Sequence, residues 1–133
     1  MSYIKVCNAD PEKCELALQL IGPLDFTVDY ITIAGPHIMG LETVFTNMFP
    51  SWKGAFCLAM SPGGILEPHR DWETIVFNAR YHIVLKNNPE CYYYHDGDKQ
   101  VLDRYGVYQM DPTKIHSAHN GGTDYRINLI IDV

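Results

Sequence analysis

From Gly54 onward the chain consists of short apolar or alternating runs separated by turn residues at fairly regular intervals. The runs cover residues 55–60, 79–86, 91–95, 100–103, 107–110, 115–119 and 125–133. The separators are rich in Gly, Pro, Asn and Asp, as in Ser61-Pro62-Gly63-Gly64 and Asp96-Gly97. Many short strands joined by tight turns are typical of sandwiches, barrels and jelly rolls. The pattern therefore predicts a mainly β core over residues 54–133.

Residues 1–53 are patterned differently and predict a helical and strand flank. Asp10-Pro11 is typical of a helix N-cap followed by Pro, and apolar residues then recur at helical spacing up to Gly22-Pro23. Residues 26–33 are rich in β-branched and aromatic side chains and predict a strand. Apolar residues at helical spacing over 41–48 predict a second short helix before Pro50. No repeat or linker-like segment interrupts the chain, so we expect one domain over residues 1–133.

Composition excludes several classes of protein. The 133 residues are 47% hydrophobic and carry a formal net charge of −6, and no run of about 18 apolar residues is present to cross a membrane. An acidic chain without a Lys/Arg block argues against non-specific nucleic-acid binding. The first residues lack the features of a secretory signal, and the four cysteines are scattered without CxxC spacing. We therefore expect a cytoplasmic protein with reduced, mostly buried thiols and no membrane or nucleic-acid partner.

His69 and Asp71 lie two residues apart, after a Gly-Gly turn and a short apolar run. An imidazole and a carboxylate at this spacing can reach one metal ion, although a solvated loop is the simpler interpretation of this motif alone. His116 and His119 lie late in the strand-rich half, and because side chains alternate along a strand, at most one of them should reach the same site. Two imidazoles and one carboxylate leave coordination positions open, which is the usual arrangement for catalytic Fe(II) in oxygenases.

Two arginines lie in runs that are mostly apolar. Alternation places Arg126 with Asn128 on one face of residues 125–133, and Arg80 with His82 on one face of residues 79–86. A guanidinium inside a barrel can bind a carboxylate through two parallel hydrogen bonds. A surface edge strand and a solvent-facing strand would show the same alternation, so each motif alone leaves both interpretations open.

Taken in order, His69-x-Asp71, Arg80-x-His82, His116 with Asn120, and Arg126 resemble the aspartyl/asparaginyl β-hydroxylase-like family of Fe(II)/2-oxoglutarate-dependent oxygenases, which includes proline hydroxylase-like members. The likeness extends from about Ala55 to Val133. It implies a double-stranded β-helix, a jelly roll of the cupin-like kind. Animal members lack the carboxylate ligand that Asp71 would provide, and they have a serine where this chain has Leu58.

The family resemblance also implies roles for individual residues. His69, Asp71 and His116 would be the catalytic iron ligands, Arg126 would bind the distal carboxylate of 2-oxoglutarate, and Arg80 and His82 would help to hold this cosubstrate. Fe(II), 2-oxoglutarate and O2 would then serve to hydroxylate an amino acid or an amino-acid side chain, with release of succinate and CO2.

The substrate, a small-molecule or peptidyl amino acid, is expected beside residues 69–71, where Arg70, Trp72 and Asn78 are candidate contacts. Two other classes of function stay open. A cupin-like protein can bind a metal or small anion without turnover, and an interaction protein can retain a decayed site. Two imidazoles and one carboxylate also suit Zn²⁺, but the arginines and His82 favour a dicarboxylate cosubstrate.

Overall fold

The computed structural model describes residues 2–24, 27–33, 40–71 and 79–133, and over these residues the chain forms two antiparallel sheets. The larger sheet has the order β1-β8-β5-β10-β3-β2, with β1 (Ile4–Asn8), β8 (Gly106–Met110), β5 (Arg80–Lys86), β10 (Arg126–Asp132), β3 (Gly54–Met60) and β2 (Tyr30–Ile33). The smaller sheet has the order β4-β9-β6-β7, with β4 (Ile65–His69), β9 (His116–Asn120), β6 (Cys91–His95) and β7 (Asp98–Gln100). The prediction of a mainly β protein is therefore confirmed.

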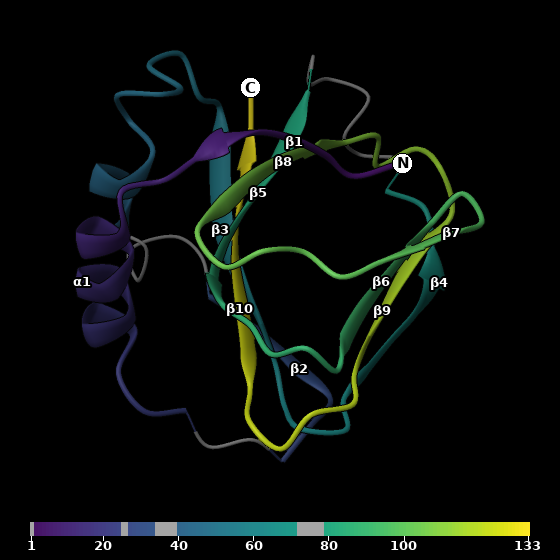
Figure 1. Cartoon of the computed structure of the whole chain (residues 1–133). Coiled ribbons are helices and arrows are strands. Elements are labelled where there is room, and N and C mark those ends of the chain that lie inside the picture. Colours follow the sequence, from purple (N-terminus) through teal and green to yellow (C-terminus); the bar gives the residue numbers. More distant parts are fainter. Residues whose placement is uncertain (1, 25–26, 34–39, 72–78) are drawn as a thin grey trace.

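The molecule is layered, with helix α1 (Pro11–Ile21) outside the larger sheet and the smaller sheet on the opposite side (Figure 1). One apolar cluster fills the space between the helical layer and the larger sheet, and it includes Phe45, Ile83 and Leu129. A second cluster, which includes Tyr93, Met60 and Val84, joins the facing sides of the two sheets. Alternate residues of β5 and β10 thus serve two different layers, as the strand periodicity predicts.

Helix α1 forms where the sequence predicts it. The Asp10 side chain accepts a hydrogen bond from the Glu12 backbone N–H at 3.0 Å, and Pro11 occupies the first turn. The helix ends at Gly22, whose φ of +71° lies in the region that favours glycine. Cys14 and Ala17 are buried against the larger sheet.

The prediction of a second α-helix is wrong. Within the described residues, the 41–48 segment forms only a short 3₁₀ helix, η2 (Leu41–Val44), followed by turns. Leu41, Val44 and Phe45 are buried, so the apolar spacing reflects packing and not α-helical winding. The side chain of Thr46 donates to the Glu42 carbonyl, and such side-chain bonds compete with the helical backbone pattern.

Most strands of the second half match the predicted runs to within one or two residues, and β6 matches in full. The run at 100–103 is an exception, because β7 begins at Asp98 directly after the turn at Asp96-Gly97, where both residues have positive φ. Strands β1 and β4 were not anticipated as strands. None of the described helices has the length and apolar character needed to cross a membrane.

Candidate functional site

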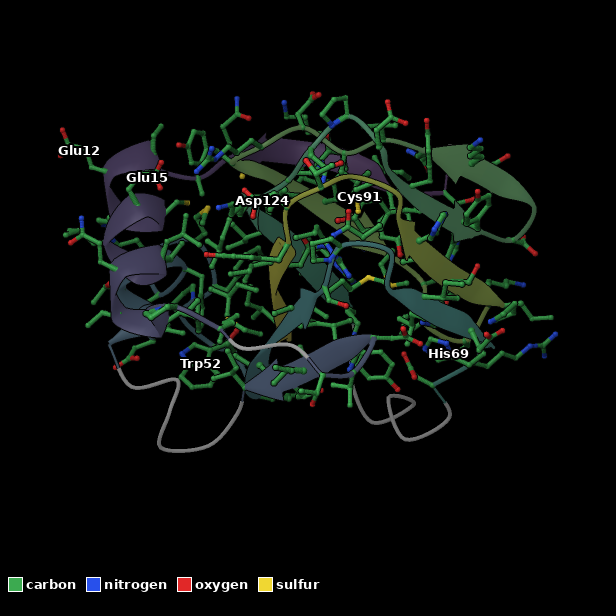
Figure 2. The ribbon with its side chains drawn as sticks, turned by 90° about the horizontal axis from the view of Figure 1, so that it is seen from below. Glu12, Glu15, Trp52, His69, Cys91 and Asp124 are labelled. Atoms are coloured by element: carbon green, nitrogen blue, oxygen red, sulfur yellow. The ribbon has the colours of Figure 1, made fainter. Side chains whose placement is uncertain are left out.

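His69, Asp71 and His116 meet where the smaller sheet faces the larger one. His69 ends β4 and His116 begins β9, and the two are direct partners in the antiparallel register. Asp71 follows β4 by two residues, and its backbone N–H donates to the Pro112 carbonyl at 3.0 Å. One nitrogen or oxygen atom from each of the three side chains lies within 4.8 Å of the others. Figure 2 shows His69 on the side of the molecule away from α1.

Both imidazoles are oriented by backbone carbonyls. His69 Nδ1 lies 2.7 Å from the Glu67 carbonyl, and His116 Nδ1 lies 2.8 Å from the Lys114 carbonyl. A carbonyl oxygen only accepts, so each Nδ1 carries the proton and donates it. Each Nε2 can therefore act as a metal ligand, and histidines that bind metals usually donate their other ring N–H in this way.

The Nε2 atoms of both rings point at the Asp71 carboxylate. His116 Nε2 lies 3.1 Å from Asp71 Oδ2, and His69 Nε2 lies 3.5 Å from Asp71 Oδ1. Where Nδ1 holds the only proton of a ring, the lone pair on Nε2 faces a carboxylate oxygen. A positive charge between these atoms, either a proton or a metal ion, removes the repulsion. The three residues therefore fit a divalent cation by donor type, spacing and orientation.

The pKa of Asp71 is lowered, so the carboxylate is ionised. Burial would raise this pKa, but the hydrogen bond and charge of His116 and the charge of Arg80 outweigh burial. An ionised oxygen ligand is the form that binds a metal.

Arg126 lies at the start of β10, inside the larger sheet, and is only 1% exposed. Nη1 donates to the Tyr93 hydroxyl at 3.0 Å, and the guanidinium lies over the Tyr93 ring. Nε and Nη2 are buried and have no hydrogen-bond partner among the described residues. Buried polar groups are nearly always paired, so two orphaned donors on a cation indicate a place for an anion. The surface edge-strand interpretation of this run is wrong, because β10 is buried between β5 and β3.

His82 is buried beside Arg126. Burial, followed by the charges of Arg126 and Arg80, lowers its pKa well below 6.5, so the ring is neutral. Asn128 contacts His82 Nδ1 at 3.1 Å, and in the amide orientation that pairs both of its polar atoms, Asn128 Oδ1 accepts from Nδ1 of His82 and, at 2.8 Å, from Nη1 of Arg126. The solvent-facing interpretation of the Arg80-x-His82 strand is wrong, because both residues are buried.

Arg80 contacts two carboxylates. Its Nε and Nη2 donate to the two oxygens of Asp132 at 2.6 and 2.9 Å, and its Nη1 donates to Asp71 Oδ2 at 3.0 Å. Three of the five N–H groups of Arg80 are thus engaged by the chain itself. We expected Arg80 to hold the cosubstrate, and that role stays a prediction, but the contacts show Arg80 beside a candidate metal ligand.

The candidate ligands and cosubstrate-binding residues all line one cavity of about 500 Å³. These six residues are His69, Asp71, Arg80, His82, His116 and Arg126. Apolar side chains form much of the remaining wall, among them Phe56, Leu58, Met110 and Ile130. Arg70 is exposed and is not among the described residues that line the cavity. Trp72 and Asn78 lie outside the described residues, so all three proposed substrate contacts stay predictions.

Sequence reasoning missed Tyr3, which is 2% exposed and lines the cavity from β1's N-terminal side. Its ring packs edge-on against His82, Tyr93 and His95. The Gln100 amide holds the Tyr3 backbone, since its Oε1 accepts from Tyr3 N–H at 2.8 Å and its Nε2 donates to the Tyr3 carbonyl at 3.0 Å. No local pattern marks this contact, because the two residues are 97 positions apart.

Two other expected residues have defined places. Asn120 is fully buried, and its Nδ2 donates to the Met60 and Asp124 carbonyls, so it joins the end of β9 to the turn before β10. His119 is paired in register with Ile65 and Tyr92 and is not part of the three-residue cluster. Of these two histidines, only His116 belongs to the three-residue cluster found among the described residues, and its role as a ligand stays a prediction.

A family model described as aspartyl/asparaginyl beta-hydroxylase matches residues 39–133, which is more than half of the chain. No curated protein sequence matches the chain.

Solved structures show the same fold at low sequence identity. A 2OG-Fe(II) oxygenase-family oxidoreductase from Burkholderia pseudomallei has a TM-score of 0.66 and 13% identity, covering 92% of this chain and 78% of that one. A viral collagen prolyl hydroxylase from Paramecium bursaria Chlorella virus-1, solved as a 2OG complex, has a TM-score of 0.65 and 11% identity over 99% of this chain and 94% of that one. A cupin domain of an XRE-family transcriptional regulator from Enterobacter cloacae has a TM-score of 0.54 and 13% identity over 78% and 95%.

Proposed function

This chain belongs to the aspartyl/asparaginyl β-hydroxylase family, and we propose that it is an Fe(II)- and 2-oxoglutarate-dependent dioxygenase built on a jelly-roll core. The single observation that carries the proposal is that one cavity combines a His-Asp-His cluster with a buried arginine whose Nε and Nη2 lack partners among the described residues. A metal ligand set alone fits many enzymes. The nearby orphaned guanidinium donors favour a ligand with a free carboxylate.

His69, Asp71 and His116 would hold Fe(II) through Nε2, a carboxylate oxygen and Nε2. Their Nδ1–H bonds to the Glu67 and Lys114 carbonyls keep both rings oriented without a change on binding. Two neutral imidazoles and one carboxylate leave a net positive charge on Fe(II), which favours an anionic cosubstrate.

Arg126 would bind the distal carboxylate of 2-oxoglutarate through Nε and Nη2, because a guanidinium and a carboxylate match in a two-bond geometry. Tyr93 would keep the guanidinium in place through the bond from Nη1 to its hydroxyl. Burial raises the pKa of Tyr93, so this hydroxyl stays protonated and adds no negative charge beside the cosubstrate. His82, neutral and buried, completes the wall on this side.

When bound together, Fe(II) and 2-oxoglutarate supply O2-dependent hydroxylation of a C–H bond, with succinate and CO2 as co-products. The chain contributes binding, orientation and a cavity wall rich in apolar groups. The substrate we propose is a free or peptidyl amino acid beside residues 69–71, with Arg70, Trp72 and Asn78 as candidate contacts. We propose a cytoplasmic location and no nucleic-acid partner.

The test is an anaerobic titration with Fe(II) and 2-oxoglutarate, followed by the charge-transfer absorption of the ternary complex. Wild type should show this band, and His69→Ala and Arg126→Ala should each lose or weaken it. Glu15→Gln is the matched control, because Glu15 lies on α1 and binds Arg104 and Tyr105, far from His69 (Figure 2). No band in wild type, or a full band in both variants, would overturn the site assignment.

Turnover separates the enzyme from the second candidate, a non-catalytic cupin-like metal or small-anion binding protein. The likeness of the fold to a cupin domain of a transcriptional regulator is the observation that supports this second candidate. In air, an oxygenase converts 2-oxoglutarate to succinate when offered amino acids or peptides. If the chain binds Fe(II) and 2-oxoglutarate but forms no succinate with any substrate offered, the result supports the non-catalytic binding protein.

A further inference from the structure

We propose that Asp132, acting through Arg80, is a positioning residue that orients the Asp71 carboxylate for metal binding. This inference rests on the metal site of the proposed function and adds a residue that neither the sequence motifs nor the comparisons assign. Asp132 lies on the same face of β10 as Arg126 and Asn128, but it is not among the residues that line the cavity.

The first step is the rigid pairing of Asp132 with Arg80. The two residues face each other across β10 and β5, as direct partners in the register. Asp132 is 4% exposed and Arg80 is 8% exposed, so water competes little for the two parallel hydrogen bonds. Two backbone bonds next to the pair hold the strand ends, because Val133 N–H donates to the Ala79 carbonyl at 2.9 Å and Ala79 N–H to the Val133 carbonyl at 3.2 Å.

The second step is the direction that this pairing gives to the rest of the guanidinium. Asp132 engages Nε and Nη2, and the Phe56 ring lies 5.4 Å from the guanidinium carbon. The planar group therefore has one orientation, which leaves Nη1 aimed at Asp71 Oδ2 at 3.0 Å. A lysine or an unbraced arginine would not direct a donor to one oxygen in this way.

The third step is the effect on the metal ligand. Asp71 follows the end of β4, where the carboxylate has a side-chain exposure of 25%. The bond from Arg80, together with the backbone bond to Pro112, limits the rotation of this carboxylate and keeps an oxygen toward His69 and His116. Outer-shell partners of this kind change metal affinity by about 10- to 100-fold when removed.

The alternative for Arg80 is the role implied by the resemblance, direct contact with 2-oxoglutarate. The two roles differ in what they predict for Asp132, because a residue outside the cavity cannot touch a cosubstrate bound within it. If Asp132 acts through Asp71, its removal weakens metal binding when no 2-oxoglutarate is present. If Arg80 serves only the cosubstrate, removal of Asp132 leaves the metal affinity unchanged and raises only the KM for 2-oxoglutarate.

The experiment is calorimetric titration of the metal-free chain with Co²⁺, without 2-oxoglutarate, together with the d–d absorption of bound Co²⁺. Asp132→Asn keeps the shape of the side chain and removes its charge, and it should weaken Co²⁺ binding by about 10- to 100-fold. Glu15→Gln makes the same chemical change on α1, beside Arg104, and should bind Co²⁺ as wild type does.

A double-mutant cycle with Arg80→Met shows whether Asp132 acts through Arg80. The Asp132→Asn effect should vanish in the Arg80→Met background, since the connecting group is gone. Arg80→Lys, with circular dichroism as the check of folding, replaces Asp132→Asn if the latter fails to fold, and it should weaken Co²⁺ binding in the same range.

Three outcomes overturn a claim, and they are distinguishable. Wild-type affinity in folded Asp132→Asn refutes the positioning role, as does an equal loss in the Arg80→Met background. Absence of Co²⁺ binding by wild type refutes the metal site itself and therefore the proposed function.

Discussion

Replacement of Arg126 by Met should separate cosubstrate affinity from fold stability. Met keeps an unbranched, flexible stem but removes the guanidinium, and therefore the two donors, Nε and Nη2, that have no partner among the described residues. The variant is directed at a buried group of a central strand, where most substitutions destabilise. Here, in contrast, we expect the substitution to weaken 2-oxoglutarate binding much more than it lowers the free energy of unfolding.

The magnitude follows from the hydrogen bonds available. A hydrogen bond that involves a charged group contributes about 1.5–3 kcal/mol, so two bonds to a carboxylate contribute about 3–6 kcal/mol. At about 1.4 kcal/mol per factor of ten, 2-oxoglutarate binding should weaken by about 10² to 10⁴-fold. In the ligand-free chain, Met removes two unpaired donors that each cost about 1–3 kcal/mol and loses the bond to Tyr93. The two contributions have opposite signs, so the free energy of unfolding should fall by no more than about 2 kcal/mol.

Calorimetric titration of the Co²⁺-loaded chain with two 2-oxo acids measures this effect. 2-Oxoglutarate tests the distal carboxylate, and 2-oxobutyrate is the matched control because it has the same oxo-acid group without that carboxylate. Wild type should prefer 2-oxoglutarate strongly, whereas Arg126→Met should bind the two acids about equally. Urea denaturation of the ligand-free wild type and Arg126→Met gives the change in the free energy of unfolding.

Two results would refute the reasoning. Retention of the wild-type preference for 2-oxoglutarate in Arg126→Met would show that another group binds the distal carboxylate. A loss of unfolding free energy far above about 2 kcal/mol would show that the orphaned donors carry structural bonds in the free chain.

Three further predictions concern stability. Burial, and then the charge of Arg126, lowers the pKa of His82 well below 6.5, so the unfolded chain binds a proton below that pH while the folded chain does not. The free energy of unfolding should therefore fall by up to about 1.4 kcal/mol per pH unit below 6.5. Urea denaturation at pH 5 and 6.5 should show a smaller fall for His82→Gln than for wild type. An equal fall in the two proteins contradicts the lowered pKa of His82. Gln100→Ala should lower the unfolding free energy by about 1–3 kcal/mol, because it removes the side-chain bonds that hold the Tyr3 backbone, and a thermal melt indistinguishable from wild type would argue against this anchor. Phe45→Ala should cost about 3–5 kcal/mol, since the side chain is 0% exposed in the cluster beneath α1, and a loss below about 1 kcal/mol in guanidinium denaturation would place Phe45 outside the core.

Local sequence patterns predicted the elements whose cause is local. The Asp10-Pro11 cap and the Gly22 end define α1, and the period-two alternation of β5 and β10 places Arg80 and His82, like Arg126 and Asn128, on one face each. The same logic failed for residues 41–48, because apolar spacing reports which side chains are buried and not whether the backbone winds as an α-helix or a 3₁₀ helix.

The chemical types of the candidate site were also readable from the sequence, since motifs such as His69-x-Asp71 keep both side chains within a few residues. Their shared cavity was inferred from a resemblance, and the structure describes it with distances.

Which polar groups contact each other depends on the packing of distant strands. Asp132 meets Arg80 through the register of β10 with β5, and Tyr3 enters the cavity because Gln100, 97 positions away, binds its backbone. Such contacts have no local signature, because strand pairing joins residues by register and not by sequence spacing. The β-rich core, α1 and the residue types of the site could be predicted from the amino-acid sequence, since these depend on periodicity and side-chain chemistry. The fold decided that Arg80 contacts two carboxylates while Arg126 keeps two buried donors without a partner among the described residues, because only packing brings charges together or holds them apart.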